Sequence, residues 1–411
     1  MKHSLARTAL PMLIGMTFGV FFILSCSTVE QSSTQSEQPP STHQQFEEQL
    51  SSLDRQIGEN PNEISLRVQK ANLLVDYAKS REEPSQRKPV YQNLRDLSAS
   101  TAQINQYTDE LEPVITAAWA EEQSSGMRLL QQNDSETIDT HFETIIAHFE
   151  NAITIIPDSL VTYSLKATTF YRNGYLNEAV KTLETAKRMA ESTDLEISEK
   201  LAYLYLESGK LDESVAIYRD LVESQPDDDH FHHGLVNAYI LNNQHEKAVD
   251  LLQLLVEKYP TRYNYQEALA TELYFIFEKE AGLILSNPGS YDPADESIGQ
   301  LVDKLEDVHS MFEALKSDIP TNEENIYRMA AFYKNSASKL REISASLSLN
   351  NESKESIEAL EKAHLEYGLP LWERLTEINP DNLEYLTGLR NIYQNLGMEE
   401  EAESLERSIN F

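Results

Sequence analysis

Three consecutive segments of this sequence repeat the same residue types at steps of 34 or 35 residues. Each copy begins with a small or apolar residue, followed three positions later by an aromatic residue and four positions after that by a turn-forming residue. The matching positions are Ala167, Ala202 and Val236; Phe170, Tyr205 and Tyr239; Gly174, Gly209 and Asn243; Ala179, Ser214 and Ala248; and Leu183, Tyr218 and Leu252. A repeat of this length constrains the fold strongly, because each copy must be one supersecondary unit.

Each copy predicts two helices joined by a tight turn. The first small residue and the aromatic residue three positions later share one helix face. Glycine suits the turn because it adopts positive φ without a steric penalty. Neither helix can bury its apolar stripe alone, so successive copies must stack on one another.

This pattern resembles the tetratricopeptide repeat, whose motif has small, aromatic and glycine positions at a period of about 34 residues. The resemblance covers residues 160–262. It implies an all-α fold, a right-handed α-solenoid of helix hairpins.

Prolines extend the repeat beyond this segment. Six prolines each stand ten residues before a position that matches the first residue of a copy, and the residues after them can cap a new helix. They are Pro61, Pro157, Pro226, Pro260, Pro320 and Pro380. The last three are 60 residues apart, which predicts hairpins whose helices are longer by about two or three turns. The final copy has Arg390 where the others have a small or apolar residue.

The only cysteine, Cys26, follows a positively charged start and a 15-residue apolar run. That run is shorter than the ~20 residues of a membrane-spanning helix, and the layout is typical of an export signal. The residues Ile-Leu-Ser-Cys resemble the lipobox of bacterial lipoproteins, which implies that Cys26 carries acyl chains such as palmitate after cleavage. The alternative is an uncleaved signal anchor with an incidental cysteine. By resemblance to lipoprotein sorting rules, Ser27 favours the outer membrane of the bacterial cell envelope, and we expect the protein to face the periplasm.

These features divide the chain into six predicted regions. A tether rich in Ser, Thr, Gln and Pro should stay flexible, because such a segment cannot bury an apolar core. The regions are a signal peptide (1–25), the tether (26–45), irregular helical hairpins (46–157), three regular repeats (158–262), two expanded 60-residue units (263–380) and a C-terminal hairpin (381–411).

Charge and motifs narrow the function. The chain has 34 basic and 68 acidic residues, for a formal net charge of −34. Such a surface repels nucleic-acid phosphates and favours a basic partner. The sequence contains no G-x-S-x-G, H-E-x-x-H or C-x-x-C motif, so we expect neither an enzyme nor a cofactor.

The tetratricopeptide resemblance also implies where a partner binds, because the first helix of each hairpin lines the concave surface in that family. Carried over by position, the expected contact residues are Tyr171, Arg172, Glu199, Tyr203, His233, Asn237, Glu267 and Tyr274. Tyrosine, carboxylate and amide groups together suit a peptide or extended segment. The alternative for each tyrosine is simple packing between neighbouring repeats. A clamp for a terminal carboxylate is not expected, since Ser164, Glu199 and His233 stand where such clamps have their first lysine.

The stretch Asp-Asp-Asp-His-Phe-His-His, residues 227–233, has some features of a metal site. His230 and His233 share a helix face, and carboxylates precede them. Acidic residues are also favoured at a helix start, where they cap backbone N–H groups. We therefore expect a solvated helix start and no metal site.

Together these observations predict a lipid-anchored, non-enzymatic scaffold for protein–protein interaction at a bacterial envelope. One alternative is a component of outer-membrane protein assembly or secretion. Another is a glycan- or nutrient-binding lipoprotein partnered with an outer-membrane transporter, although only two tryptophans, Trp119 and Trp372, are available as sugar platforms. A hydrolase is a weaker alternative, because catalytic carboxylates need no sequence motif.

Overall fold

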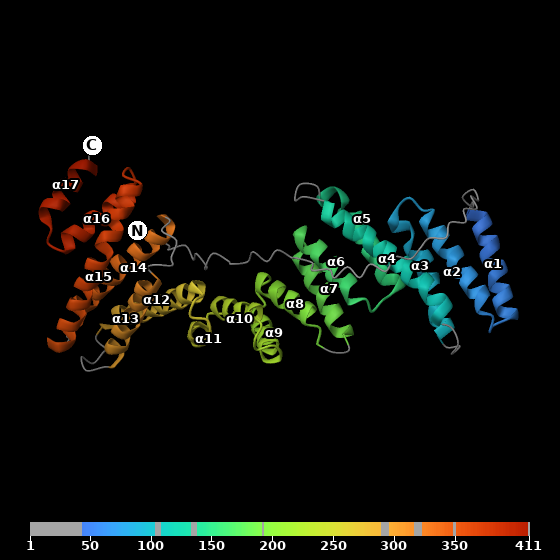
Figure 1. Ribbon diagram of the computed structural model, residues 1–411, viewed down its shortest axis with the longest axis horizontal. Coiled ribbons are helices and arrows are strands. Elements are labelled where there is room, and N and C mark those ends of the chain that lie inside the picture. Colours follow the sequence, from blue (N-terminus) through green and yellow to red (C-terminus); the bar gives the residue numbers. More distant parts are fainter. Residues whose placement is uncertain are drawn as a thin grey trace. The chain divides into compact units, whose positions relative to one another are not determined.

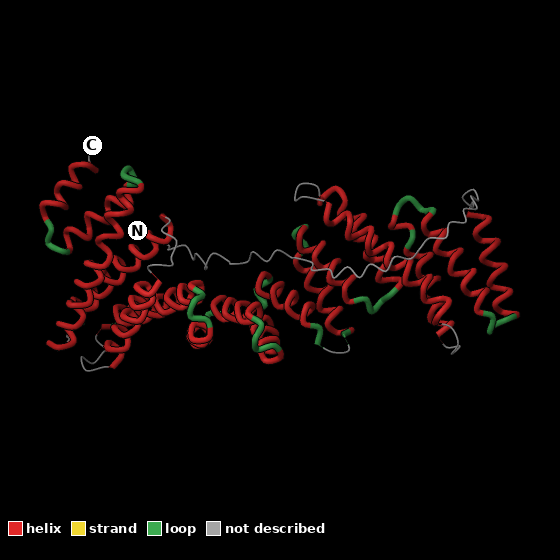
Figure 2. The backbone as a smooth tube through the Cα atoms, viewed as in Figure 1, coloured by secondary structure: helices red, strands yellow, loops and turns green. Residues whose placement is uncertain are grey.

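The computed structural model describes residues 43–102, 108–132, 138–190, 193–288, 296–315, 323–347 and 351–409. Within these ranges every regular element is a helix, and no strand occurs (Figure 2). No helix in this part of the chain combines the length and the apolar character needed to cross a membrane. The predicted signal peptide, Cys26 and most of the predicted tether lie outside the described residues.

The chain forms two compact units, of which the first ends at Ala238 and the second begins at Tyr239. Figure 1 labels the helices of both. The first unit contains α1 (His43–Glu59), α2 (Ile64–Lys79), the short 3-10 helix η1 (Pro84–Gln86), α3 (Lys88–Ala102), α4 (Thr108–Gln132), α5 (Ile138–Ile155), α6 (Leu160–Arg172), α7 (Leu176–Met189), α8 (Leu195–Glu207), α9 (Leu211–Ser224) and most of α10 (Asp229–Leu241). The second contains the end of α10, then α11 (His245–Lys258), α12 (Tyr263–Ser286), α13 (Glu296–Leu315), α14 (Glu323–Ser346), α15 (Asn351–Ile378), α16 (Leu383–Asn395) and α17 (Glu399–Ile409).

The repeated small residues lie in the core, as predicted. Ala167 on α6 and Ala202 on α8 are 2% and 0% exposed, and Ala179 on α7 is also fully buried. Ser214 on α9 replaces the second alanine of its copy, and its hydroxyl donates a hydrogen bond to the Ala202 carbonyl at 2.8 Å. Small side chains at these positions let the two helices of a hairpin approach closely. Serine can replace alanine here because its buried hydroxyl has a hydrogen-bond partner.

The predicted turns have the backbone conformation that the repeat requires. Gly174, Gly209 and Gly397 have φ of 80°, 75° and 75°, and Asn243 has φ of 54°. In each turn, the next backbone N–H donates to a carbonyl five residues earlier, at 2.8 or 2.9 Å. This hydrogen bond satisfies a carbonyl that the helix end would leave without a partner, and glycine or asparagine tolerates the left-handed conformation that it needs.

The helices of the expanded units are longer than those of the regular repeats. Helices α12, α14 and α15 have 24, 24 and 28 residues, whereas α6 to α9 have 13 or 14. The additional residues amount to about three turns or more per helix. Trp372 on α15 is 1% exposed and donates from its indole nitrogen to the Ala330 carbonyl on α14 at 3.0 Å.

Candidate protein-interaction surface

Two tyrosines that the repeat places on the predicted partner surface bind each other. The hydroxyls of Tyr171 on α6 and Tyr203 on α8 are 2.8 Å apart, and their rings meet edge to face at a centroid distance of 5.8 Å. Tyr203 is only 8% exposed, and burial together with the Tyr171 hydrogen bond raises its pKa above the usual value. The ring of Tyr203 is thus packed beside the neighbouring helix, whereas Tyr171 stays half-buried. Contact of either tyrosine with a partner stays a prediction.

Arg172 is the next residue of α6 and is exposed. Its guanidinium donates to the Leu130 carbonyl in the last turn of α4 at 3.3 Å. A cation near a helix C-terminus is favourable, because the last carbonyls of the helix carry partial negative charge. Since this contact uses one of five N–H donors, the guanidinium has further donors for a partner.

Glu199 lies half-buried on α8. Burial raises its pKa above the usual value, and the nearby His230 opposes that shift. A carboxyl in such a position gains when a cation or a hydrogen-bond donor approaches, because the charged form is then stabilised. Glu199 is therefore the predicted residue of the first unit with the clearest electrostatic reason to contact a basic partner.

A lysine lies beside Ser164, the residue that stands where terminal-carboxylate clamps have their first lysine. Lys200 on α8 donates to the Ser164 hydroxyl on α6 and to the Glu196 carboxylate, both at 2.5 Å. The ion pair with Glu196 already neutralises this ammonium group. That the protein has no clamp for a terminal carboxylate stays a prediction. The contact supports it, because the Lys200 ammonium group beside Ser164 is already paired with Glu196.

His233 and Asn237 lie half-buried on α10, in the part of that helix that belongs to the first unit. At the start of α10, the Asp228 carboxylate accepts from the backbone N–H of His230 at 2.9 Å. That contact is typical of a residue that begins a helix. Among the described residues, no group of three or more His, Cys, Asp or Glu side chains is arranged to hold a metal ion.

The two remaining predicted residues lie on α12 in the second unit. Glu267 binds the guanidinium of Arg328 on α14 at 2.9 Å. The Tyr274 hydroxyl donates to Glu278 at 2.8 Å, and its ring meets Phe332 of α14 edge to face at 5.0 Å. Burial and the neighbouring Glu278 raise the pKa of Tyr274. These contacts join α12 to α14, so both residues support the helix packing of their unit.

Sequence reasoning missed one residue beside these. Arg328 was not a candidate, although the 60-residue step from Ala270 to Ala330 would have placed it beside the face of Glu267. Phe275 is 43% exposed on α12, with its ring 4.2 Å from that of His245. An exposed aromatic ring beside a polar group is a common element of protein interfaces.

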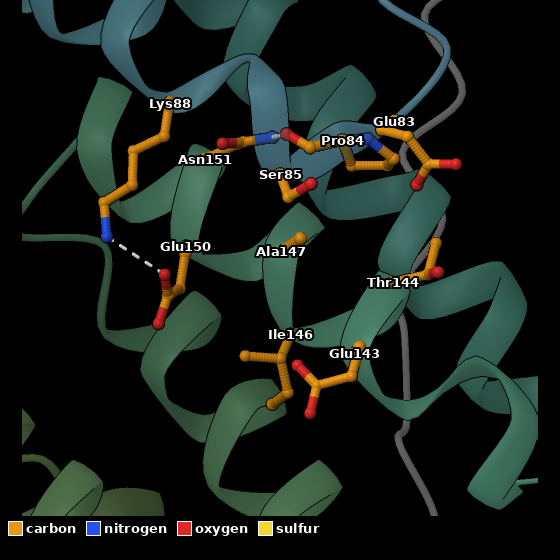
Figure 3. Close-up of a pocket in the computed structure, with 10 residues that line it drawn as sticks. All are labelled: Glu83, Pro84, Ser85, Lys88, Glu143, Thr144, Ile146, Ala147, Glu150 and Asn151. Atoms are coloured by element: carbon orange, nitrogen blue, oxygen red, sulfur yellow. Dashed lines mark hydrogen bonds and ion pairs between the residues drawn. The ribbon is translucent and has the colours of Figure 1, made fainter.

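A cavity of about 370 Å³ lies elsewhere in the first unit, between the η1 segment and α5 (Figure 3). Its walls include Glu83, Pro84, Lys88, Glu143, Glu150 and Asn151. Sequence analysis assigned no site to this region, because residues 46–157 follow the repeat too irregularly to set a register.

The stacked helix hairpins define an all-α solenoid. Residues 205–272 match the family model for the tetratricopeptide repeat, which confirms the resemblance inferred from the spacing of small and aromatic residues. No curated protein is significantly similar to the chain.

Several solved structures share helical features with the chain at low identity. MamA (residue 41 to the end) from Desulfovibrio magneticus has 13% identity and a TM-score of 0.36, covering 49% of this chain and 97% of its own. A tetratricopeptide repeat protein from Parabacteroides merdae has 10% identity and a TM-score of 0.35, covering 77% and 99%. A repeat protein from Bacteroides fragilis has 11% identity and a TM-score of 0.31, covering 58% and 99%. Such values carry no argument about function.

Proposed function

We propose that this protein is a non-enzymatic scaffold that holds a protein or peptide partner on the first helices of its tetratricopeptide hairpins. The tetratricopeptide repeat is a protein-binding module, which supports a role as a scaffold for protein–protein interaction. The observation that carries the proposal is the half-buried Glu199, whose pKa is raised by burial. The repeat pattern predicts that Tyr171 and Asn237 share its surface. A basic group on the partner would stabilise the charged form of this carboxylate.

The net charge of −34 supports a basic partner. Negative potential over an acidic surface accelerates the encounter with a cationic protein, and added salt weakens the attraction. Several of the side chains on the first helices are already held by hydrogen bonds, as Tyr171 is by Tyr203. Fewer rotamers are then lost on binding, which lowers the entropic cost of association.

Crosslinking in the host cell followed by affinity purification would recover the partner. Binding should then be compared between Glu199→Gln and Asn237→Ala on the first helices and Glu213→Ala and Lys181→Ala on the exposed faces of α9 and α7. We expect the first pair to weaken binding by ~1–2 kcal/mol each and the second pair to change it little. Loss of binding in the second pair, with the first pair unchanged, would place the partner on the opposite face.

We further propose that Cys26 anchors the protein in the outer membrane, with the scaffold facing the periplasm. The support is the sequence alone: a basic start, a short apolar run and a cysteine at its end. Two or three acyl chains hold a protein stably on a membrane, because each buried CH₂ contributes ~0.8 kcal/mol. Feeding labelled palmitate should label the native chain and not Cys26→Ser, and fractionation should find the label in the outer membrane. A membrane-bound protein without label would reject the anchor.

A further inference from the structure

The second unit contains a half-buried lysine whose charge is not paired within the described residues. Lys334 lies on α14, and its ammonium group forms no hydrogen bond or ion pair with any residue that the structure describes. Such a group is unexpected in a chain with 68 acidic and 34 basic residues. Every other half-buried lysine in the described part of the chain is paired with a carboxylate: Lys70, Lys166, Lys200, Lys304 and Lys339.

An indole ring determines where this ammonium group lies. Nζ of Lys334 is 5.1 Å from the centroid of the Trp372 ring on α15. The ring is held in place, because its nitrogen donates to the Ala330 carbonyl at 3.0 Å and its edge packs against Gly388 of α16. The aromatic face attracts the cation, but the three N–H donors of the ammonium group have no oxygen acceptor among the described residues.

A tyrosine holds a carboxylate whose charge acts on Lys334. That carboxylate belongs to Glu384 at the start of α16. The hydroxyl of Tyr327, two turns before Lys334 on α14, donates a hydrogen bond to it. Burial and the neighbouring Glu384 raise the pKa of Tyr327 to about 12, so the hydroxyl keeps its proton at neutral pH. Glu384 is therefore bound to Tyr327 and forms no ion pair with Lys334.

Burial destabilises the charge of Lys334. It lowers the pKa of the ammonium group, and the nearby Glu384 offsets this effect only in part. An anionic oxygen in contact with Nζ would stabilise the cation, because it supplies both the opposite charge and a hydrogen-bond acceptor. The side chain is half-buried and not fully enclosed, so a ligand can reach it.

We propose that Lys334 binds the carboxylate of an aspartate or glutamate side chain from a protein partner. The ammonium group has only donors, and a carboxylate has only acceptors. The net charge of −34 repels an acidic partner at a distance. At ~0.15 M salt this repulsion is largely screened beyond ~8 Å, whereas a partly buried pair in contact is screened much less. The site therefore selects an acid by direct contact and not by long-range attraction.

This inference rests on the proposed scaffold function, because α14 is the first helix of its predicted hairpin. The site shares no residue with the surface around Glu199 in the first unit, so either can fail alone. Its test uses a small peptide and does not depend on recovery of the partner of the first unit.

Trp372 supplies a local signal for the test. The full chain has two tryptophans, so Trp119→Phe leaves one indole NMR signal when tryptophan is isotope-labelled. Acetyl-Gly-Glu-Gly-amide, whose only carboxylate is the glutamate side chain, should shift this signal at ~0.15 M salt, because it binds the ammonium group above the ring. The neutral glutamine counterpart should bind about tenfold more weakly.

Variants then separate the site from the general charge of the chain. Lys334→Met and Lys334→Gln both remove the ammonium group, and each should abolish the saturable shift. Lys334→Arg keeps a cation on the ring and should retain binding within about threefold. Lys362→Met removes the same charge from an exposed position of α15 and should change binding by less than about twofold. Circular dichroism and melting curves confirm that each variant is folded.

Three results would overturn the proposal: no saturable shift in the Trp119→Phe protein, equal binding of the two peptides, or an undiminished response in Lys334→Met or Lys334→Gln. An equal loss in Lys362→Met would do the same, since binding would then follow net charge alone.

Discussion

The ring of Tyr218 on α9 occupies the space where a side chain at Gly234 on α10 would begin. A Cβ atom at position 234 would lie 2.0 Å from Cε1 of Tyr218. The same relationship joins Trp372 on α15 to Gly388 on α16, where a Cβ would lie 2.3 Å from Cζ3 of the indole. Each aromatic residue precedes its glycine by 16 residues. A large ring on the second helix of one hairpin thus packs directly against the backbone of the next hairpin.

Gly234→Ala should therefore destabilise the protein by ~1–3 kcal/mol, because the new methyl group must displace the buried Tyr218 ring. Thermal and urea denaturation measure the change. Gly282→Ala on α12 is the matched control, since no atom beyond the adjoining backbone of its own helix lies within 4 Å of its Cβ position. Alanine also favours a helix interior over glycine by ~0.5–1 kcal/mol. Equal melting temperatures for the two variants would contradict this packing.

Ala202→Glu tests the packing of α8 against α9. Ala202 is fully buried, and its carbonyl accepts the Ser214 hydroxyl, so a glutamate there would bury a charge without a partner. We expect a loss of more than about 3 kcal/mol in the free energy of unfolding. Ala190→Glu, just beyond the end of α7, should cost less than ~1 kcal/mol. Similar denaturation curves for Ala202→Glu and the native chain would show that the repeat register is wrong.

The turns and the close contacts between helices could be predicted from the sequence, because each of these positions accepts only a few residue types. Gly174, Gly209 and Asn243 could be identified because few residues tolerate positive φ. Ala167 and Ala202 could be identified because a larger side chain would separate two helices. Such requirements recur with the period of the repeat and are visible in a single sequence.

The candidate surface was less predictable, because the position of a residue on a helix does not determine whether its side chain faces a partner or packs against a neighbouring helix. Tyr203 occupies a place that faces partners in the tetratricopeptide family, yet its ring packs beside Tyr171 and is buried. Glu122 and Asn151 form a polar group that depends on contacts between α4, α5 and the η1 segment. No periodic signal marks such contacts, because each of these residues meets partners far away in the sequence.

Glu122→Gln tests the buried polar group of the first unit. Burial alone would raise the pKa of Glu122, but the hydrogen bonds from His148 and Arg87 outweigh it and lower the pKa below its usual value. The carboxylate therefore stabilises the fold above the pKa of unfolded glutamate, and this contribution is lost as the pH falls through the lower pKa of the folded state. The variant should lose ~3–5 kcal/mol at neutral pH, since its former partners remain buried.

The difference in stability between Glu122→Gln and the native chain should shrink as the pH falls below ~4. Urea denaturation at several pH values measures it. Glu178→Gln on α7 supplies the control, because Glu178 is exposed, and its effect should stay within ~0.5 kcal/mol. A constant difference for Glu122→Gln across the acidic range would mean that its carboxylate does not contribute as a charged group.

His364 in the second unit should make stability depend on pH between ~6.5 and ~4. The side chain is fully buried on α15, and its Nδ1 lies 2.6 Å from the Ser336 hydroxyl, which itself donates to the Phe332 carbonyl at 2.8 Å. Nδ1 must therefore donate to Ser336. Burial, helped by the nearby His309, lowers the pKa of His364 to about 4. The folded protein thus favours the neutral ring over the cation.

An unfolded histidine takes up a proton at a pH near 6.5, whereas His364 in the folded protein does so near pH 4. The stabilising contribution of the neutral ring is therefore complete above pH ~6.5 and falls by about 3 kcal/mol as the pH drops to ~4. Urea denaturation from pH 7.5 to 4.5 should show that the combined change His364→Phe and Ser336→Ala removes most of this slope. His230→Asn at an exposed position should retain it. A double variant with the native slope would show that other groups cause the dependence on pH.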